Sequence, residues 1–195
     1  ANAGVEISML NVGGGFPSPY LEAELPKLHR YFDEVNSAWQ QYFANSNAEL
    51  VCEPGRGLVD TCVTLLTKVK HRREQPVVYL NDGVYGGFME QVFSPIELPV
   101  RHYRSDGTPV DEQETTASTV FGPTCDSIDK PYYQPQLHQS IAEGDYLEWG
   151  LMGGYGSSTA TKFNGFESNL YVTVDEAFDY PAAVQSMLTD KAETA

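Results

Sequence analysis

Three consecutive glycines at positions 13–15 follow a short apolar segment, and this feature limits the possible folds more than any other. The apolar segment, residues 4–12, is typical of a strand that ends at the glycines. Residues 26–44 then carry apolar side chains at steps of three and four, which predicts an amphipathic helix with Pro26 in its first turn. A second apolar run with a Pro-Gly ending occupies residues 48–57. Strand, helix and strand in this order predict a βαβ unit whose two loops lie at the same edge of a parallel pair.

From about residue 60 the chain changes to short stretches of β-branched and aromatic residues, separated by Gly, Pro, Asn and Asp. This pattern is typical of an antiparallel β domain. The stretches expected to carry strands are residues 58–72, 76–88, 98–105, 117–127, 144–156 and 169–176. We therefore predict an α/β unit at residues 1–60 and a β domain at residues 61–195.

The charge of the chain limits the partners that it can bind. Its 195 residues include 12 Lys and Arg against 27 Asp and Glu, which gives a net charge of −15. This charge repels nucleic-acid phosphates and anionic lipids, and it favours a cationic ligand. Solubility alone is the alternative explanation of the same charge. We expect no nucleic-acid partner and no membrane partner.

Cysteine and histidine usage indicates the compartment and the absence of a metal site. The three cysteines, Cys52, Cys62 and Cys125, are an odd number without a repeating spacing, and no stretch resembles a signal peptide or a membrane span. We therefore expect the reducing cytoplasm. None of the four histidines lies in a metal-ligand spacing, so no metal is expected. The chain begins with Ala1 rather than Met, which suggests that it starts within a longer gene product.

Two predicted loops carry groups suited to a phosphate. A glycine triplet presents backbone N–H groups to an anion without intervening Cβ atoms, although this one fits neither the GxGxxG nor the Walker pattern, and a tight turn is the alternative. Glu53 and Arg56, in "CEPGR", end the next strand, where ligand-binding groups of α/β barrels collect. A guanidinium suits a phosphate and a carboxylate suits a protonated ring nitrogen. The alternative is an ordinary surface ion pair.

Five stretches in order resemble one known family: "LNVGGGFP", "CEPGR", "YLNDGVYGGF", "FGPTCDSIDK" and "GDYLEWGLMGGYGSSTATKFNGF". They are similar to the signatures of the pyridoxal-phosphate decarboxylases that share a fold with alanine racemase, closest to the ornithine/lysine branch. The resemblance covers residues 4–172. It implies the last part of an alanine-racemase-like (β/α)8 barrel at residues 1–60, followed by a C-terminal antiparallel β-sandwich or β-barrel domain at residues 61–195.

The resemblance also implies an activity, a cofactor and a partner. The activity is the decarboxylation of ornithine or lysine to a diamine in polyamine biosynthesis, and the cofactor is pyridoxal 5′-phosphate. The partner is a second copy of the chain, because the family places its active sites at the interface of a homodimer. "GPTCDSID" favours the ornithine/lysine branch. The alternatives are a decarboxylase of arginine, diaminopimelate or carboxynorspermidine, and a non-catalytic regulatory relative.

By this resemblance, the cofactor-binding residues fall into two groups. Glu53 would face the pyridine nitrogen and keep it protonated, so that the ring withdraws electrons during decarboxylation. The residues that would hold the cofactor phosphate are Gly13, Gly14, Gly15, Arg56 and Tyr155. Packing is the alternative role for the tyrosine.

Four further positions match residues near the substrate. Cys125 would steer protonation after carbon dioxide leaves, from the neighbouring subunit, and Asp126 would receive the distal ammonium of a diamino acid. Tyr85 matches a position close to the active site. The alternatives are a small buried cysteine, a turn-capping aspartate and a packing tyrosine. Ser94 stands where ornithine-selective members carry an aspartate, so a neutral group replaces one contact to the ammonium and leaves the substrate open.

The lysine that bonds covalently to the cofactor has no counterpart here. The family carries it on the first barrel strand, upstream of the glycine loop, and residues 1–60 hold too few strands to close a barrel. None of the lysines lies in the matching motif: Lys27, Lys68, Lys70, Lys130, Lys162 and Lys191. We therefore expect the C-terminal half of a decarboxylase, completed by its own upstream half or by a separate chain. By itself it is expected to be inactive and to expose apolar barrel surface.

Overall fold

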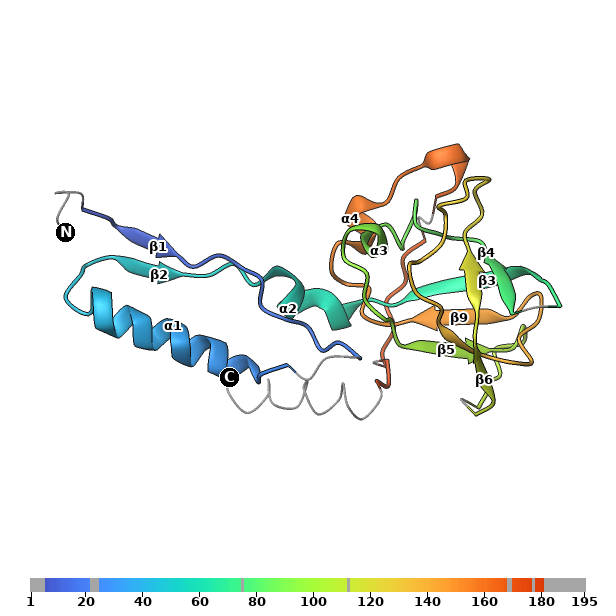
Figure 1. The fold of residues 1–195 in the computed structure, drawn as a ribbon, viewed down its shortest axis with the longest axis horizontal. Coiled ribbons are helices and arrows are strands. Elements are labelled where there is room, and N and C mark those ends of the chain that lie inside the picture. Colours follow the sequence, from blue (N-terminus) through green and yellow to red (C-terminus); the bar gives the residue numbers. More distant parts are fainter. Residues whose placement is uncertain are drawn as a thin grey trace.

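The computed structural model describes residues 6–21, 25–74, 76–111, 113–167, 170–176 and 178–180. Figure 1 shows an elongated molecule with a small α/β unit at one end and a larger β-rich domain at the other. Between the two ends lie helix α2 (Gly55–Val59) and a 3₁₀ turn (Asp60–Cys62). The chain therefore changes from α/β to mainly β structure near residue 60.

The α/β unit consists of strand β1 (Met9–Asn11), helix α1 (Leu28–Phe43) and strand β2 (Glu49–Val51). β1 and β2 pair in parallel, with Leu10 opposite Leu50, so the predicted βαβ unit is confirmed. The helix begins two residues after its predicted start and ends one residue before its predicted end. The first strand is shorter than predicted, and the first two residues of that prediction, 4 and 5, lie outside the described part.

Helix α1 has an amphipathic pattern, yet none of its residues is fully buried in the described structure. Phe32 stacks on Phe16 of the glycine-loop segment, with ring centroids 4.9 Å apart. Met9 of β1 is 52% exposed and Tyr42 of α1 is 71% exposed. Two strands and one helix offer too little surface to cover these side chains, since a sheet of this size needs further packing partners. The apolar exposure expected of a partial barrel is therefore observed.

The β domain is built on a five-stranded sheet with the strand order β5-β9-β3-β4-β7. A separate antiparallel pair, β6 (Thr115–Ala117) and β8 (Gln136–His138), completes the strands. The strands of the larger sheet are β3 (Leu65–Arg72), β4 (Val77–Leu80), β5 (Val100–Tyr103), β7 (Thr119–Phe121) and β9 (Tyr146–Trp149). The prediction of a wholly antiparallel domain is wrong in one respect, because β4 and β7 pair in parallel. The long connection between these two strands gives the chain room to return in the same direction.

Several predicted strand segments have another structure. Residues 58–62, which belong to a predicted strand stretch, lie in α2 and the 3₁₀ turn. Residues 170–176 form no strand, although Val172 and Val174 are β-branched; the two valines are 75% and 69% exposed. A strand needs a partner for its backbone groups, and β propensity alone does not provide one. The sequence also gave no signal for the short helices α3 (Glu90–Phe93) and α4 (Gly156–Thr159). No helix in the described part of the chain is both long and apolar enough to cross a membrane.

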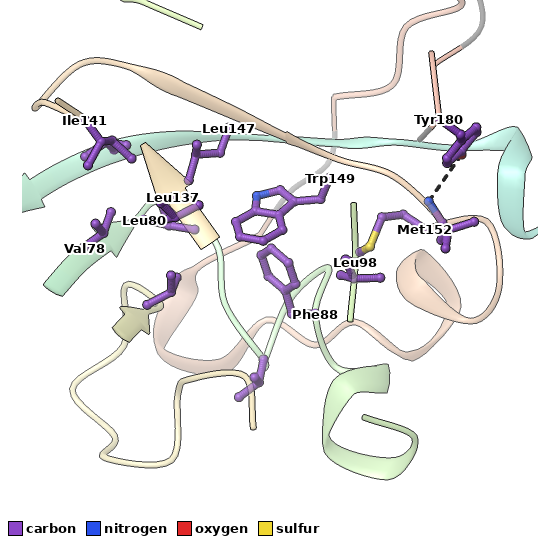
Figure 2. Packing of buried hydrophobic residues seen from close by; sticks show 14 residues of the cluster. Val78, Leu80, Phe88, Leu98, Leu137, Ile141, Leu147, Trp149, Met152 and Tyr180 are labelled. Carbon is purple, nitrogen blue, oxygen red and sulfur yellow. Dashed lines mark hydrogen bonds between the residues drawn. The ribbon is translucent and has the colours of Figure 1, made fainter. Parts of the chain in front are cut away.

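One core of buried side chains supports the β domain (Figure 2). Trp149 of β9 is fully buried and meets Phe88 edge to face, with ring centroids 5.1 Å apart. The indole N–H donates to Thr67 Oγ1 at 2.9 Å, so the one polar atom of the ring is satisfied. Burial of each large apolar side chain stabilises the domain by about 1.5–3 kcal/mol. This core fixes the loops that follow β4 and β9, which carry Tyr85 and Tyr155.

Candidate functional site

The glycine loop is anchored to the end of β2 by backbone hydrogen bonds. The N–H of Glu53 donates to the carbonyl of Gly13 at 2.8 Å, and the Asn11 side chain accepts the N–H of Gly13 at 2.8 Å. Gly13 and Gly15 have φ angles of +78° and +79°, a region in which only glycine is free of strain. The two loops at the ends of the parallel strands therefore lie together, as predicted.

Gly14 has a different physical reason to be glycine. A Cβ atom at this position would lie 2.5 Å from the carbonyl oxygen of Glu53, which is far inside van der Waals contact. Among the described residues, neither Gly14 nor Gly15 donates its backbone N–H to a protein acceptor. These two N–H groups are therefore available as hydrogen-bond donors to an anion.

Arg56 lies in the first turn of α2, with only 13% of its side chain exposed. Its guanidinium forms a two-pronged ion pair with Glu90 of α3, in which Nη1 donates to Oε2 at 2.9 Å and Nη2 faces Oε1. Asp60 Oδ1 lies 3.5 Å from Nη1 on the other side. The guanidinium carbon is also 5.4 Å from the centre of the Tyr155 ring. One cation is therefore shared by two carboxylates and an aromatic face.

Tyr155 immediately precedes α4 and has a left-handed backbone with a φ of 64°. Its hydroxyl lies close to the start of α2, because a Cβ atom added to Gly55 would be 3.5 Å from it. The preceding Gly154 donates its N–H to Asp60 Oδ1 at 3.2 Å, which ties the tyrosine loop to the helix that carries Arg56. The structure therefore brings Tyr155 and Arg56 together from positions 99 residues apart.

The predicted cofactor residues thus form one group, which we call the anion cluster: the glycine loop, Glu53, Arg56 and Tyr155. Glu53 stands at the end of β2 with an exposed side chain, three residues before Arg56. The carbonyl of Phe16, just after the glycine loop, is 3.2 Å from the position that a Cβ atom on Gly57 would take. The loop therefore packs directly against the first turn of α2.

A second group contains Tyr85 and Asp126. The Tyr85 hydroxyl donates to Asp126 Oδ2 at 2.6 Å, and the Tyr85 ring stacks on Phe163 with centroids 4.3 Å apart. This hydrogen bond raises the pKa of Tyr85 to about 12, because losing the proton would leave two negative charges in contact. The same bond lowers the pKa of Asp126, since it stabilises the carboxylate. Asp126 is therefore ionised at neutral pH.

Cys125 is exposed, and its sulfur accepts a hydrogen bond from Asn164 Nδ2 at 3.6 Å. Asn164 follows Phe163 directly, so one segment contacts both Cys125 and Tyr85. No hydrogen bond, ion pair or ring contact between described residues links Cys125 or Asp126 directly to the anion cluster. The predicted site residues thus fall into two groups within one chain.

The buried carboxylate of Asp129 holds the loops of this second group in place. Asp129 Oδ1 accepts the N–H of Val84 at 2.8 Å, and Oδ2 accepts the N–H and hydroxyl of Thr124 at 2.9 and 2.6 Å. Cβ atoms on Gly83 and Gly122 would lie 2.1 and 2.2 Å from Asp129 Oδ1, so both glycines are required by its close approach. Asp129 therefore joins the Tyr85 loop to the Cys125 loop.

Ser94 ends α3 and is exposed, and its N–H donates to the carbonyl of Glu90 at 2.8 Å. No contact between its side chain and Asp126 is present among the described residues. The same short helix carries Glu90, whose carboxylate contacts Arg56 instead. The sequence carries no signal for the direction of the Glu90 side chain, and none for the support from Asp129.

Comparison with known proteins identifies the family. The protein-family model described as "Pyridoxal-dependent decarboxylase, C-terminal sheet domain" matches residues 42–153. A second family model, "Pyridoxal-dependent decarboxylase, pyridoxal binding domain", matches residues 1–60. The chain belongs to the pyridoxal-dependent decarboxylase family. The resemblance read from the motifs is therefore confirmed, and pyridoxal phosphate is the cofactor of this family.

Several members of the decarboxylase family have about the same sequence identity to this chain. "Decarboxylase flvG" of Aspergillus flavus is 32% identical over 90% of the chain and 43% of its own length. "Antizyme inhibitor 2" of Xenopus laevis is 30% identical over 85% of the chain and 39% of its own length. The lysine/ornithine decarboxylase complexed with cadaverine from Vibrio vulnificus superposes with a TM-score of 0.73 at 30% identity, over 90% of the chain and 46% of that structure. The chain thus spans less than half the length of these relatives.

The anion cluster fits the phosphate group of this decarboxylase cofactor in its donor types. Gly14 and Gly15 offer backbone N–H groups, Arg56 offers a guanidinium and Tyr155 offers a hydroxyl, all of which donate to phosphate oxygens. Glu90, next to the cluster, opposes a phosphate, because its carboxylate is already bound to the guanidinium.

Proposed function

We propose that this chain is the C-terminal part of a pyridoxal-phosphate-dependent decarboxylase of ornithine or lysine, which produces a diamine for polyamine biosynthesis. The observation that carries the proposal is the convergence of the glycine loop, Arg56 and Tyr155 at the end of a parallel strand pair. These donors come from three separate stretches of the sequence. Ion pairing within the chain explains Arg56 but gives no reason for the free donors of the loop.

The cofactor end of the site has a simple division of roles. The N–H groups of Gly14 and Gly15, the Arg56 guanidinium and the Tyr155 hydroxyl bind the phosphate. The carboxylate of Glu53 holds a proton on the pyridine nitrogen. Bound pyridoxal phosphate supplies the electron-accepting ring that makes loss of carbon dioxide from an amino acid feasible.

The substrate end uses the second group. The ionised Asp126 accepts the distal ammonium of the substrate, and the Tyr85 hydroxyl fixes the direction of this carboxylate. Cys125 holds a proton at its sulfur near the carbon that loses carbon dioxide, and Asn164 orients the sulfur. Because Ser94 is neutral, the preference for one chain length of substrate is weaker than with a second carboxylate.

The anion cluster and the group around Asp126 are not in direct contact within one chain, which favours an active site shared between two chains. We propose that Cys125 and Asp126 complete the site of a second copy in a cytoplasmic homodimer. The lysine that bonds to the cofactor is then supplied by an upstream half, either in the same polypeptide or as a separate chain. The exposed apolar side chains of the α/β unit are the surface that this half covers.

A matched pair of arginine variants tests the proposal. In Arg56→Met, the affinity for pyridoxal 5′-phosphate should fall at least roughly tenfold, since a charge-assisted bond to phosphate is lost. The control is Arg73→Met, because Arg73 lies over Tyr79 at 5.3 Å, much as Arg56 lies over Tyr155 at 5.4 Å. Equal affinities for the two variants would refute the assignment of Arg56. Release of carbon dioxide from ornithine and lysine, measured after addition of the upstream half, tests the activity.

A non-catalytic regulatory protein is the second candidate function. It is favoured by the Glu90 carboxylate, which occupies the phosphate-binding arginine, and by the similarity to a relative named as an antizyme inhibitor. The two candidates differ in one measurement. A regulator shows no carbon dioxide release from any basic amino acid after addition of the upstream half, whereas the decarboxylase does.

A further inference from the structure

The ion pair between Arg56 and Glu90 lies at the point where the proposed function needs a bond to phosphate. Glu90 is the first residue of α3 and follows Arg56 by 34 positions, so the pair depends on the tertiary fold. Both side chains are largely shielded, with 13% and 14% exposed. Nη1 donates to Oε2 at 2.9 Å, and such a charge-assisted bond is roughly twice as strong as a neutral one.

The two carboxylates around Arg56 are not equivalent. Asp60 is 2% exposed and also accepts the N–H of Gly154, so its position is tied to the loop that precedes Tyr155. Among the described residues, by contrast, Arg56 is the only polar partner of the Glu90 carboxylate. Glu90 is therefore the group that can leave the guanidinium without undoing the rest of the cluster.

A phosphate in this position meets Glu90 in two ways. Phosphate oxygens need the same Nη1 and Nη2 donors that Glu90 occupies. A doubly charged phosphate beside an ionised carboxylate is also repelled, and this repulsion is only weakly screened because the pair is mostly buried. Binding through Arg56 thus requires the Glu90 carboxylate to move away.

We propose that Glu90 competes with the cofactor phosphate for Arg56 and so sets the affinity of the chain for pyridoxal phosphate. The inference rests on the proposed function, because it takes the anion cluster as the phosphate site. Glu90 is then a specificity residue, because it reduces the difference in affinity between pyridoxal phosphate and unphosphorylated pyridoxal.

The test is a binding measurement on the chain combined with the upstream half, with two ligands, pyridoxal 5′-phosphate and pyridoxal. Glu90→Gln keeps the size of the side chain and removes its charge, and Glu90→Ala removes the carboxylate entirely. The matched control is Glu143→Gln, because Glu143 also contacts a basic side chain, His71, with both side chains 57% exposed. Thermal melts of all variants confirm that each one is folded before binding is measured by equilibrium dialysis.

Both Glu90 variants should bind pyridoxal phosphate roughly tenfold more tightly than the unchanged chain, since the competing charge-assisted bond is gone. Their affinity for pyridoxal should not change, and the control should match the unchanged chain with both ligands. Equal or weaker binding of pyridoxal phosphate by the folded variants would overturn the inference while leaving the proposed function intact. If neither the unchanged chain nor a Glu90 variant binds pyridoxal phosphate in the presence of the upstream half, the proposed function and the inference both fail.

Discussion

Replacement of Asp129 by alanine should destabilise the chain far more than replacement of Asp126, although both stand on one loop. Asp129 is 1% exposed, and its carboxylate accepts three hydrogen bonds, from Val84 and Thr124. Asp126 is only partly buried, and water can replace its bond from Tyr85. The two variants therefore compare a buried and a solvated carboxylate on the same segment.

The magnitude follows from the donors that lose their acceptor. Alanine at position 129 leaves two backbone N–H groups without partners, and each one costs about 1–3 kcal/mol when it stays buried. The free energy of unfolding should therefore fall by about 2–6 kcal/mol. A typical domain has only about 5–15 kcal/mol in total, so Asp129→Ala removes a large part of its stability.

Urea denaturation followed by tryptophan fluorescence measures this difference, because the buried Trp149 reports on the core. The expected order of midpoints is unchanged chain, Asp126→Ala and then, well below, Asp129→Ala. Asp129→Asn should also be destabilising. Its side-chain NH₂ group would face the N–H groups that now donate to the carboxylate, although the substitution creates no cavity. If both Asp129 variants unfold at the midpoint of Asp126→Ala, the carboxylate does not join the two loops as argued.

Two further predictions concern other parts of the chain. Gly14→Ala should lower the free energy of unfolding by about 1–3 kcal/mol, because the new Cβ atom meets the backbone of Glu53; an unchanged urea midpoint would contradict this. Burial lowers the pKa of His102 from its ordinary 6.5, despite the opposing hydrogen bond to Asp145. The unfolded chain therefore takes up the proton first, and stability should be lost as the pH falls below about 6.5. His102→Gln should flatten this loss between pH 7.5 and 5, and equal slopes for both chains would exclude His102 as its source.

Much of the α/β unit could be predicted because its signals are local. The apolar steps of residues 26–44 placed the helix within two residues at either end. The order of strand, helix and strand was enough to predict a parallel pair with neighbouring loops, which the bond between Glu53 and Gly13 confirms. Right-handed crossover connections leave few alternatives for such a unit.

The β domain was predicted less well, because pairing between strands depends on distant parts of the chain. The parallel pairing of β4 and β7 has no local signature, and residues 170–176 look like a strand but have no partner in the described structure. The bond between Arg56 and Glu90 likewise depends on the tertiary fold, since the two residues are 34 positions apart in the sequence. Motif spacing along the chain does not show which way the Glu90 side chain points.

The acidic character of the chain acts in opposite directions at the two groups of the proposed site. A net charge of −15 favours the approach of a diamino acid to Asp126, and it opposes the approach of a doubly charged phosphate to Arg56. Phosphate binding must therefore come from short-range donors, namely the loop N–H groups, the guanidinium and the Tyr155 hydroxyl. With so few donors, the bond that Glu90 takes from Arg56 is a large share of the total. Under the proposed function, this one ion pair therefore sets how tightly the chain binds pyridoxal phosphate.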